Sequence, residues 1–159
     1  MTFDPRALRD VFGCFTTGVT VITTNPADAP VVGVTANSFS SVSLDPPLVL
    51  WCLGKESDTV PVFESVPNYA INFLAKDQEE LSNHCAKRGD HSLDCAELDV
   101  ATTGAPIIKG AIASLDCEIA DRIDAGDHII MLGKVVDIVI QDIDRAPLVF
   151  GRGQYRALS

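Results

Sequence analysis

A run of small polar side chains between two apolar segments is the most unusual feature of this sequence. It extends over residues 33–50 and carries four serines, a threonine and an asparagine. Such residues cannot build a core, but at a strand end their hydroxyls and the exposed backbone N–H groups can surround a polar, anionic ligand. Pro46 and Pro47 favour extended backbone before them, and residues 48–53 are typical of a buried strand. The run is therefore predicted as a binding loop held between core strands.

A second polar group follows this strand. Lys55, Ser57 and Thr59 precede an apolar segment that contains Pro61. Proline favours the first turn of a helix and serine or threonine caps it, so a short helix is predicted to begin here. At a helix N-terminus, free N–H groups, two hydroxyls and an ammonium group can gather a phosphate. Capping alone is the alternative interpretation of the same residues.

His128 stands out among the ionisable residues, because it opens a long predicted strand directly after Gly126 and Asp127. A single strand histidine also fits a plain surface or half-buried position. Neighbouring strand residues point to opposite faces, so Asp127 is not expected to contact the imidazole and is assigned to the turn. Tyr155 and Arg156 are candidates to close over a bound ligand, although a mobile chain end fits them too.

Catalytic and metal-binding patterns are not readable in the sequence. Neither a nucleophile with its base nor a pair of acid–base carboxylates can be recognised, so a cofactor is expected to supply the chemistry if the chain is an enzyme. The five cysteines are an odd number without a C-x-x-C motif, which favours buried thiols over a disulfide framework. His84, Cys85, His91 and Cys95 match no standard zinc spacing, so no metal site is predicted.

The charge balance limits the possible partners. Lysine and arginine number 12 against 22 aspartates and glutamates, which gives a formal net charge of −10. This charge argues against nucleic acid and against an anionic membrane surface as partners. A site for an anionic ligand then needs local positive charge. The candidates are Lys55, Lys87, Arg88, Arg152 and Arg156.

Length and hydropathy indicate one globular domain over residues 1–159. No apolar run approaches the roughly 20 residues that a membrane-spanning helix needs, and the N-terminus lacks the features of a signal peptide. The protein is therefore expected in the cytoplasm.

Two or three helices are predicted around the strands. The first begins at an Asp4 cap with Pro5 in its first turn, and its apolar face, which includes Val11, Phe12 and Phe15, is expected to pack on the sheet. The short helix near Pro61 is the second. Residues 77–86 are predicted as the third, with acidic residues in the first turn. Lys87 and Arg88 directly after it can simply complement its dipole.

Strands make up most of the remaining chain. They are predicted at residues 19–24 and 31–35, which form a hairpin, and at 48–53, 68–74, 112–122, 127–140 and 148–150, with a turn at 123–126. Residues 92–103 are predicted as irregular apart from a helical turn at 95–98. The absence of β-α-β alternation and of a G-x-G-x-x-G motif argues against a Rossmann nucleotide site. A mainly β, antiparallel barrel fits better.

Three linked motifs resemble the flavin reductase-like family, and the resemblance covers nearly the whole chain in the expected order. They are TTGVTVITT at residues 16–24, GVTANSFSSVSLDPPLV at 33–49 and GDH at 126–128. The resemblance implies an FMN-binding split barrel, usually a homodimer with flavin near the interface. It also implies an NAD(P)H:flavin oxidoreductase that supplies reduced flavin to a partner monooxygenase. The sequence leaves open FMN or FAD, NADH or NADPH, and flavin as prosthetic group or as substrate.

The resemblance also implies roles for individual residues. The edge of the flavin ring is assigned to Thr35, Ala36, Asn37 and Ser38, and its face to Cys52 and Leu53. The ribityl chain and phosphate are assigned to Ser40, Ser41, Lys55, Ser57 and Thr59, with Lys87 and Arg88 bordering the phosphate. His128 is assigned to the nicotinamide. Two alternatives stay open, a non-catalytic flavin- or haem-binding split barrel and a pyridoxine phosphate oxidase-like enzyme, although the polar run resembles the second much less.

Overall fold

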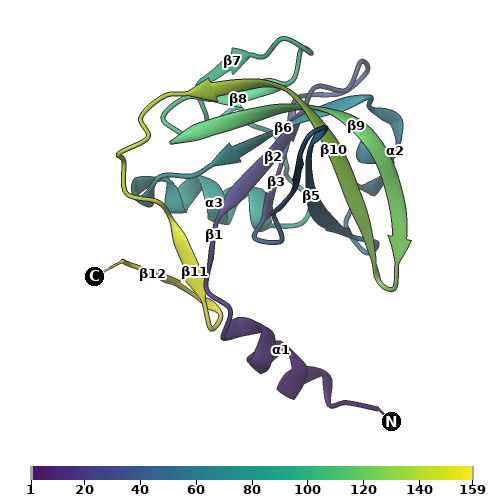
Figure 1. Ribbon diagram of the computed structural model, residues 1–159, viewed down its shortest axis with the longest axis vertical. Helices are drawn as coiled ribbons and strands as arrows, with labels where there is room; N and C mark the ends of the chain where they lie inside the picture. Colours follow the sequence, from purple (N-terminus) through teal and green to yellow (C-terminus); the bar gives the residue numbers. More distant parts are fainter. Residues whose placement is uncertain (1, 159) are drawn as a thin grey trace.

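The computed structural model describes residues 2–158 and consists mainly of strands (Figure 1). The helices are α1 (Pro5–Gly13), α2 (Val60–Ser65) and α3 (Glu79–Ala86), with a 3-10 turn, η1 (Lys76–Gln78), before α3. The strands are β1 (Thr17–Gly18), β2 (Thr20–Thr24), β3 (Val32–Ala36), β4 (Ser40–Leu44), β5 (Pro47–Gly54), β6 (Asn68–Phe73), β7 (Leu98–Val100), β8 (Pro106–Ile108), β9 (Ala113–Ala125), β10 (His128–Ile140), β11 (Val149–Gly151) and β12 (Gln154–Arg156).

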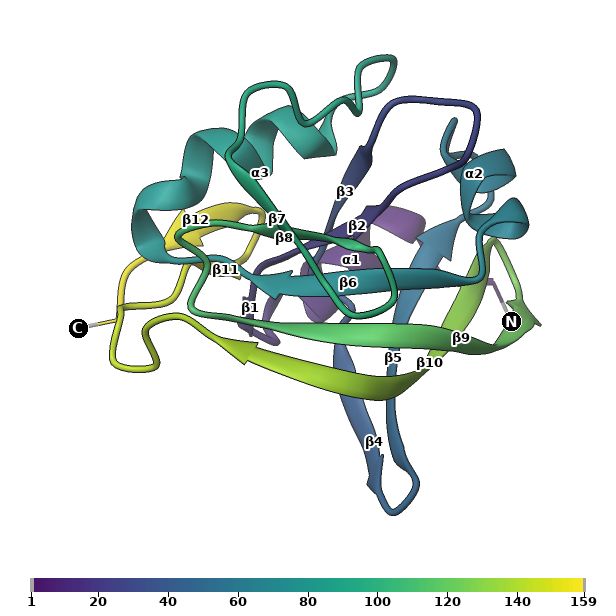
Figure 2. The same ribbon diagram turned by 90° about the horizontal axis from the view of Figure 1, so that it is seen from above.

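One sheet of seven strands organises the molecule. Its order is β3-β2-β6-β9-β10-β5-β4, and every paired neighbour runs antiparallel. Smaller ribbons of β1-β11-β12 and β7-β8 lie beside it, and the β4–β5 hairpin projects from the sheet (Figure 2). The predicted hairpins at residues 19–35 and 112–140 are confirmed, because β-branched strand residues and short polar turns specify them locally.

The main core lies on one face of this sheet. Trp51, Phe63 and Tyr69 are fully buried and meet edge to face, with ring centroids 5.0 Å apart for Trp51–Phe63 and 5.9 Å for Trp51–Tyr69. The Tyr69 hydroxyl donates to the carbonyl of Met131 at 3.2 Å, and burial raises the pKa of this phenol. Gly133 is required beside it, because a Cβ there would collide with the Tyr69 hydroxyl.

A buried polar network joins the sheet to β8. The Asn72 side chain donates to the carbonyl of Val21 and to the hydroxyl of Thr23, each at 3.0 Å. Its oxygen accepts the backbone N–H of Ile108 at 2.9 Å and the hydroxyl of Ser114 at 2.8 Å. All four bonding positions of this fully buried amide are thus used, which satisfies the polar groups that burial would otherwise penalise.

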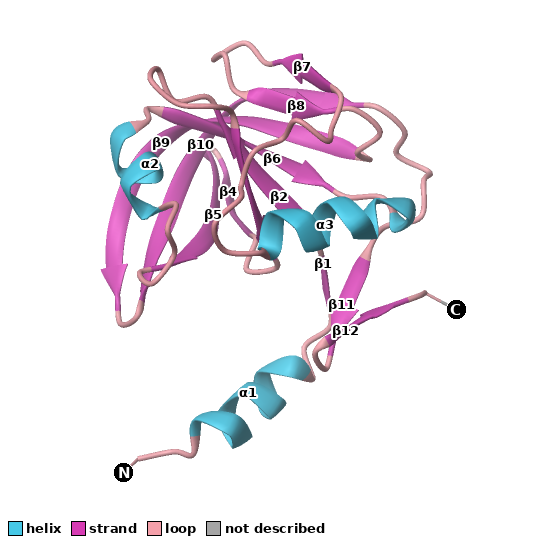
Figure 3. Cartoon of the chain, turned by 180° about the vertical axis from the view of Figure 1, so that it is seen from behind, coloured by secondary structure: helices cyan, strands magenta, loops and turns pink. Residues whose placement is uncertain are grey.

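Helix α1 lies apart from the sheet, as Figures 1 and 3 show. The predicted Asp4 cap is confirmed, since its carboxylate accepts the N–H of Arg6 at 3.1 Å. The prediction that the apolar face of α1 packs on the sheet is wrong, because the helix has no buried residue and Phe12 and Phe15 are 66% and 79% exposed. The pattern shows that the helix has an apolar face, but it cannot say what that face meets.

Several element boundaries also differ from the sequence expectations. The polar run is not one loop, because residues 40–44 form strand β4 and only residues 37–39 and 45–46 lie between strands. Residues 98–100 form β7 instead of irregular chain, and no helix occurs at 95–98. Strand β9 continues to Ala125, so the turn of the long hairpin is shorter than expected. In each case pairing with the next strand along the chain extends structure that local composition does not reveal.

No helix in the described residues 2–158 is long and apolar enough to span a membrane.

Candidate functional site

Ser38 and Cys52 connect the 37–39 loop to strand β5. The backbone N–H of Cys52 donates to the Ser38 hydroxyl at 2.9 Å. Side chains of β5 alternate, so Trp51 and Leu53 face the core while Cys52 is half-buried on the other face. Burial raises the pKa of the Cys52 thiol, which keeps it protonated at neutral pH. Leu53 is 2% exposed, so its side chain is inside the core and only its backbone remains for a ligand.

Strand β10 brings His128 to the same face as Cys52. In the antiparallel register Ile130 lies opposite Cys52, and His128 lies opposite Gly54. A Cβ at Gly54 would lie 3.7 Å from Nε2 of His128, so the imidazole extends over the glycine. Cys52 and His128, which the resemblance assigns to the flavin ring and to the nicotinamide, thus share one half-exposed, partly apolar surface.

Asp127 and His128 form a direct pair. Oδ1 of Asp127 lies 2.7 Å from Nδ1 of His128, so the prediction that they do not interact is wrong. Asp127 lies in the tight turn after Gly126, which has φ +66°, and strand alternation does not apply there. The hydrogen bond to His128 lowers the pKa of the Asp127 carboxyl. In the neutral imidazole this contact puts the proton on Nδ1 and leaves Nε2 as an acceptor.

Lys55 contacts the tip of the β9–β10 hairpin and not the neighbouring hydroxyls of Ser57 and Thr59. Its ammonium group pairs with Asp124 and donates to the carbonyl of Gly126 at 2.7 Å, while its backbone N–H donates to the carbonyl of Asp127 at 2.9 Å. The predicted phosphate role of Lys55 therefore competes with contacts that hold the turn before His128.

The Ser57 and Thr59 hydroxyls hydrogen-bond to each other at 2.8 Å. Thr59 is 3% exposed and caps α2 without a side-chain bond, so Ser57 is the more accessible of the two. Helix α2 has only six residues, so its dipole adds little to the anion site expected here.

The chain after α3 lies against this loop. Asp58 accepts the backbone N–H of Gly89 at 2.7 Å, and this bond lowers the pKa of its carboxyl. Lys87 and Arg88, both exposed, directly precede that contact. The Gly89–Asp58 bond, which joins residues 31 apart in the sequence, thus anchors the segment after these two cations to the residue that follows Ser57.

A cavity of about 380 Å³ lies between β3, α3 and the C-terminal ribbon, and the predicted residues Thr35, Asn37 and Tyr155 line it. The Tyr155 hydroxyl lies 2.7 Å from that of Ser82, whose carbonyl accepts the Thr35 hydroxyl at 2.6 Å. Sequence reasoning missed Ser82 and its neighbour Asn83, although small polar residues on one helix after an acidic turn were a readable signal.

The remaining predicted residues are less central to this surface. Ala36 is 8% exposed, Ser40 and Ser41 are exposed on β4, and Arg156 is exposed at the chain end, where it donates to the carbonyl of Gly151. Arg152 contributes its backbone N–H to the carbonyl of Gly13 at the end of α1.

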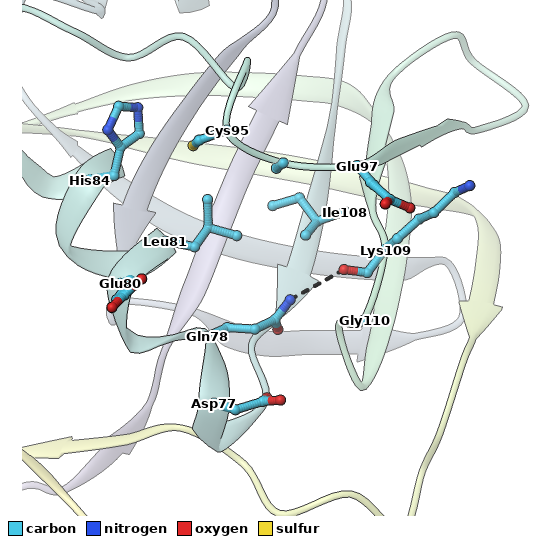
Figure 4. Close-up of a pocket in the computed structure, with 11 residues that line it drawn as sticks. Asp77, Gln78, Glu80, Leu81, His84, Cys95, Glu97, Ile108, Lys109 and Gly110 are labelled. Atoms are coloured by element: carbon cyan, nitrogen blue, oxygen red, sulfur yellow. Dashed lines mark hydrogen bonds between the residues drawn. The ribbon is translucent and has the colours of Figure 1, made fainter.

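A larger cavity of about 680 Å³ lies on the other side of α3 (Figure 4). Its walls include Asp77, Glu80 and Glu97, and none of the predicted binding residues. His84 and Cys95 lie here, but no group of three possible metal ligands occurs within residues 2–158. The cysteine expectation holds only in part, since Cys85 and Cys117 are buried while Cys14 and Cys95 are exposed.

The donor set of the site fits a flavin phosphate ester. Half-buried Cys52 and Ile130 offer contact area for an aromatic ring, and Ser38 lies at the edge of that area. The hydroxyls of the 57–59 segment and the exposed cations Lys87 and Arg88 suit a phosphate. Among known families, the flavin reductase like domain matches residues 12–159.

The chain belongs to the flavin reductase-like family.

Relatives of this flavin reductase-like chain are similar over nearly its whole length. It is 41% identical over 154 residues to the FMN reductase (NADH) SmoA of Agrobacterium fabrum, covering 97% of this chain and 86% of the relative. It is 36% identical over 156 residues to HsaB of Mycobacterium tuberculosis, a flavin-dependent monooxygenase reductase subunit, covering 98% and 83%. A relative from Rhizobium meliloti, a probable flavin reductase, is 42% identical over 153 residues. This chain spans only about half, 49%, of the length of that protein.

A solved structure with the same fold is that of the Streptomyces globisporus NADH:FAD oxidoreductase SgcE6, in complex with NAD and FAD fragments. The two chains are 37% identical, and the match covers 100% of this flavin reductase-like chain and 97% of the SgcE6 chain. They superpose with a TM-score of 0.91.

Proposed function

We propose that this protein is an NADH-dependent flavin reductase that supplies reduced FMN or FAD to a partner monooxygenase. The observation that carries the proposal is the shared face of β5 and β10. On this face the His128–Gly54 pair lies two residues along the strands from the Ile130–Cys52 pair. Hydride transfer requires nicotinamide and flavin in contact, so their binding residues must be adjacent. The activities named for SmoA, HsaB and SgcE6 support the same assignment.

Bound flavin supplies the chemistry, because its N5 accepts hydride from reduced nicotinamide. The chain's own residues bind and orient. Asp127 holds Nδ1–H of His128, so Nε2 is free to accept a hydrogen bond from the nicotinamide carboxamide. Cys52 and Ile130 would contact the ring, Ser38 would face its edge, and Ser57 with the cations after α3 would hold the phosphate.

The first experiment is oxidation of NADH and NADPH by the purified protein in air, with and without FMN or FAD, together with the visible spectrum of the isolated protein. We expect NADH loss at 340 nm that scales with protein and requires flavin. Flavin binding without nicotinamide consumption would instead favour a non-catalytic flavin-binding protein.

We also propose a homodimer. Phe12 of α1, Phe15 just after this helix, and Ile138 and Ile140 of β10 are between 61% and 79% exposed, and large exposed apolar surfaces mark interaction sites. A second copy is the occupant that the family resemblance favours. Light scattering should give a dimer, and Phe12→Glu with Phe15→Glu should convert it to monomer, whereas a monomeric wild type at micromolar concentration would contradict the proposal.

We also propose that the seven-stranded sheet curls into a split barrel, that residues 1–159 form one domain, and that the protein acts in the cytoplasm. The antiparallel strand order supports the first.

A further inference from the structure

One carboxylate connects two loops that are far apart in the sequence. Oδ2 of Asp58 accepts the backbone N–H of Gly89, and Oδ1 lies 2.7 Å from Nε2 of His91, at separations of 31 and 33 residues. Asp58 stands between Ser57 and Thr59, whereas Gly89 and His91 follow Lys87 and Arg88. We call this set of contacts, made by Asp58, Gly89 and His91, the Asp58 staple.

His91 is held firmly on its own side of the staple. Its side chain is 12% exposed, and its backbone carbonyl accepts the N–H of Gly33 in β3 at 2.9 Å. Nδ1 is buried and has no hydrogen-bond partner among the residues that the structure describes. A buried N–H with no acceptor would be costly, so the neutral ring carries its proton on Nε2 and donates it to Asp58. Donation to an ionised acceptor makes this a strong hydrogen bond.

The cations between these anchors are held at both ends. The N–H of Lys87 donates to the carbonyl of His84 at 3.2 Å, at the C-terminal end of α3. Two residues later Gly89, at φ +95°, turns the chain into the staple. Lys87 and Arg88 therefore project from a short bridge with both ends fixed, one of them at the residue that follows Ser57. Their side chains are exposed and pair with no acidic residue among the described residues 2–158.

We propose that Asp58 and His91 are positioning residues of the flavin phosphate subsite, which hold Lys87 and Arg88 against Ser57. This inference rests on the proposed function. Neither residue needs to touch the ligand. Their contribution is to fix the bridge before binding, so that less conformational entropy is lost when the phosphate is bound.

Simple electrostatics and a positioning role for Asp58 predict opposite effects on FMN affinity. Asp58 is an anion next to a site for an anion, so its removal should raise the affinity for FMN if charge alone mattered. If the staple positions the cations, removal should lower that affinity. Asp90 provides a matched control, because it is an acid of the same bridge that bonds only within its own turn, to Ser92.

The experiment compares FMN with riboflavin, which has the same ring and no phosphate, by quenching of flavin fluorescence. We expect the wild type to prefer FMN. Asp58→Ala and His91→Leu should weaken FMN binding about tenfold, equivalent to about 1.4 kcal/mol, and leave riboflavin within about twofold. His91→Gln, which retains a side-chain N–H, should restore part of the preference. Asp90→Ala should not weaken FMN binding.

The results separate the positioning role of Asp58 and His91 from the proposed reductase function. An unchanged or increased preference for FMN in Asp58→Ala would overturn the positioning role. Equal wild-type binding of FMN and riboflavin would also overturn it, while flavin-dependent NADH oxidation would still uphold the reductase. Absence of flavin binding and of NADH oxidation in the wild type would defeat the proposed function itself. Asp58 is 43% exposed, so its variant tests the staple even if His91→Leu fails to fold.

Discussion

Asp127 holds the imidazole of His128 from the turn that immediately precedes it, with 2.7 Å between Oδ1 and Nδ1. The pair lies at the end of the β9–β10 hairpin, next to Gly54 of β5. Lys55 reinforces the same turn through the carbonyls of Gly126 and Asp127. The imidazole of His128 is thus oriented by local contacts and not by burial, since its side chain is 48% exposed.

Asp127→Ala should raise the KM for NADH on the order of threefold while changing kcat less, because the ring loses its preferred tautomer and orientation. Steady-state kinetics with saturating flavin measure this. The affinity for FMN serves as the control and should stay the same. A lower flavin affinity with an unchanged KM would assign Asp127 to the flavin instead.

Asn72→Ala should lower the free energy of unfolding by about 2–4 kcal/mol, because it leaves buried donors and acceptors around it unpaired. Urea denaturation followed by tryptophan fluorescence measures the loss. Asn83→Ala is the matched control, since Asn83 is exposed and accepts only the Tyr155 hydroxyl. Equal losses in both variants would contradict the importance of the buried network.

Gly133→Ala should destabilise the fold by about 1–3 kcal/mol through overpacking, because the new methyl group meets the Tyr69 hydroxyl. Tyr69→Phe in the same chain removes that hydroxyl and should recover part of the loss. Thermal unfolding of the two single variants and the double variant measures the coupling. Strict additivity would show that the clash is relieved elsewhere.

Stability should fall in acid as exposed carboxylates lose their hydrogen bonds. Bonds from Thr102 and from the N–H of Ile138 lower the pKa of Asp137 below its ordinary 3.8. A lowered folded-state pKa contributes stability that is present above the unfolded value and lost as pH falls through the folded one. Melting temperatures between pH 7 and pH 3, for wild type and Asp137→Asn, should therefore diverge most at neutral pH and converge in acid.

Local patterns in the sequence determined much of the fold. Alternating β-branched residues and a compact polar turn specify the β2–β3 hairpin, and the Asp4-Pro5 pair specifies the start of α1. The three motifs indicated the family and, with it, a site for flavin and nicotinamide. These signals are readable because each depends on residues that lie close together in the sequence.

Only the tertiary structure decided which of the candidate residues meet. Lys55 was expected beside a phosphate, yet it pairs with Asp124, 69 residues later, because the β9–β10 hairpin folds back onto the end of β5. Asp58 gave no signal in the sequence, and its contacts with Gly89 and His91 exist only because the loop after α3 packs there. The apolar face of α1 was readable, but its place outside the sheet was not. Spacing specifies periodicity along an element, whereas the partner of a surface side chain depends on how distant elements pack.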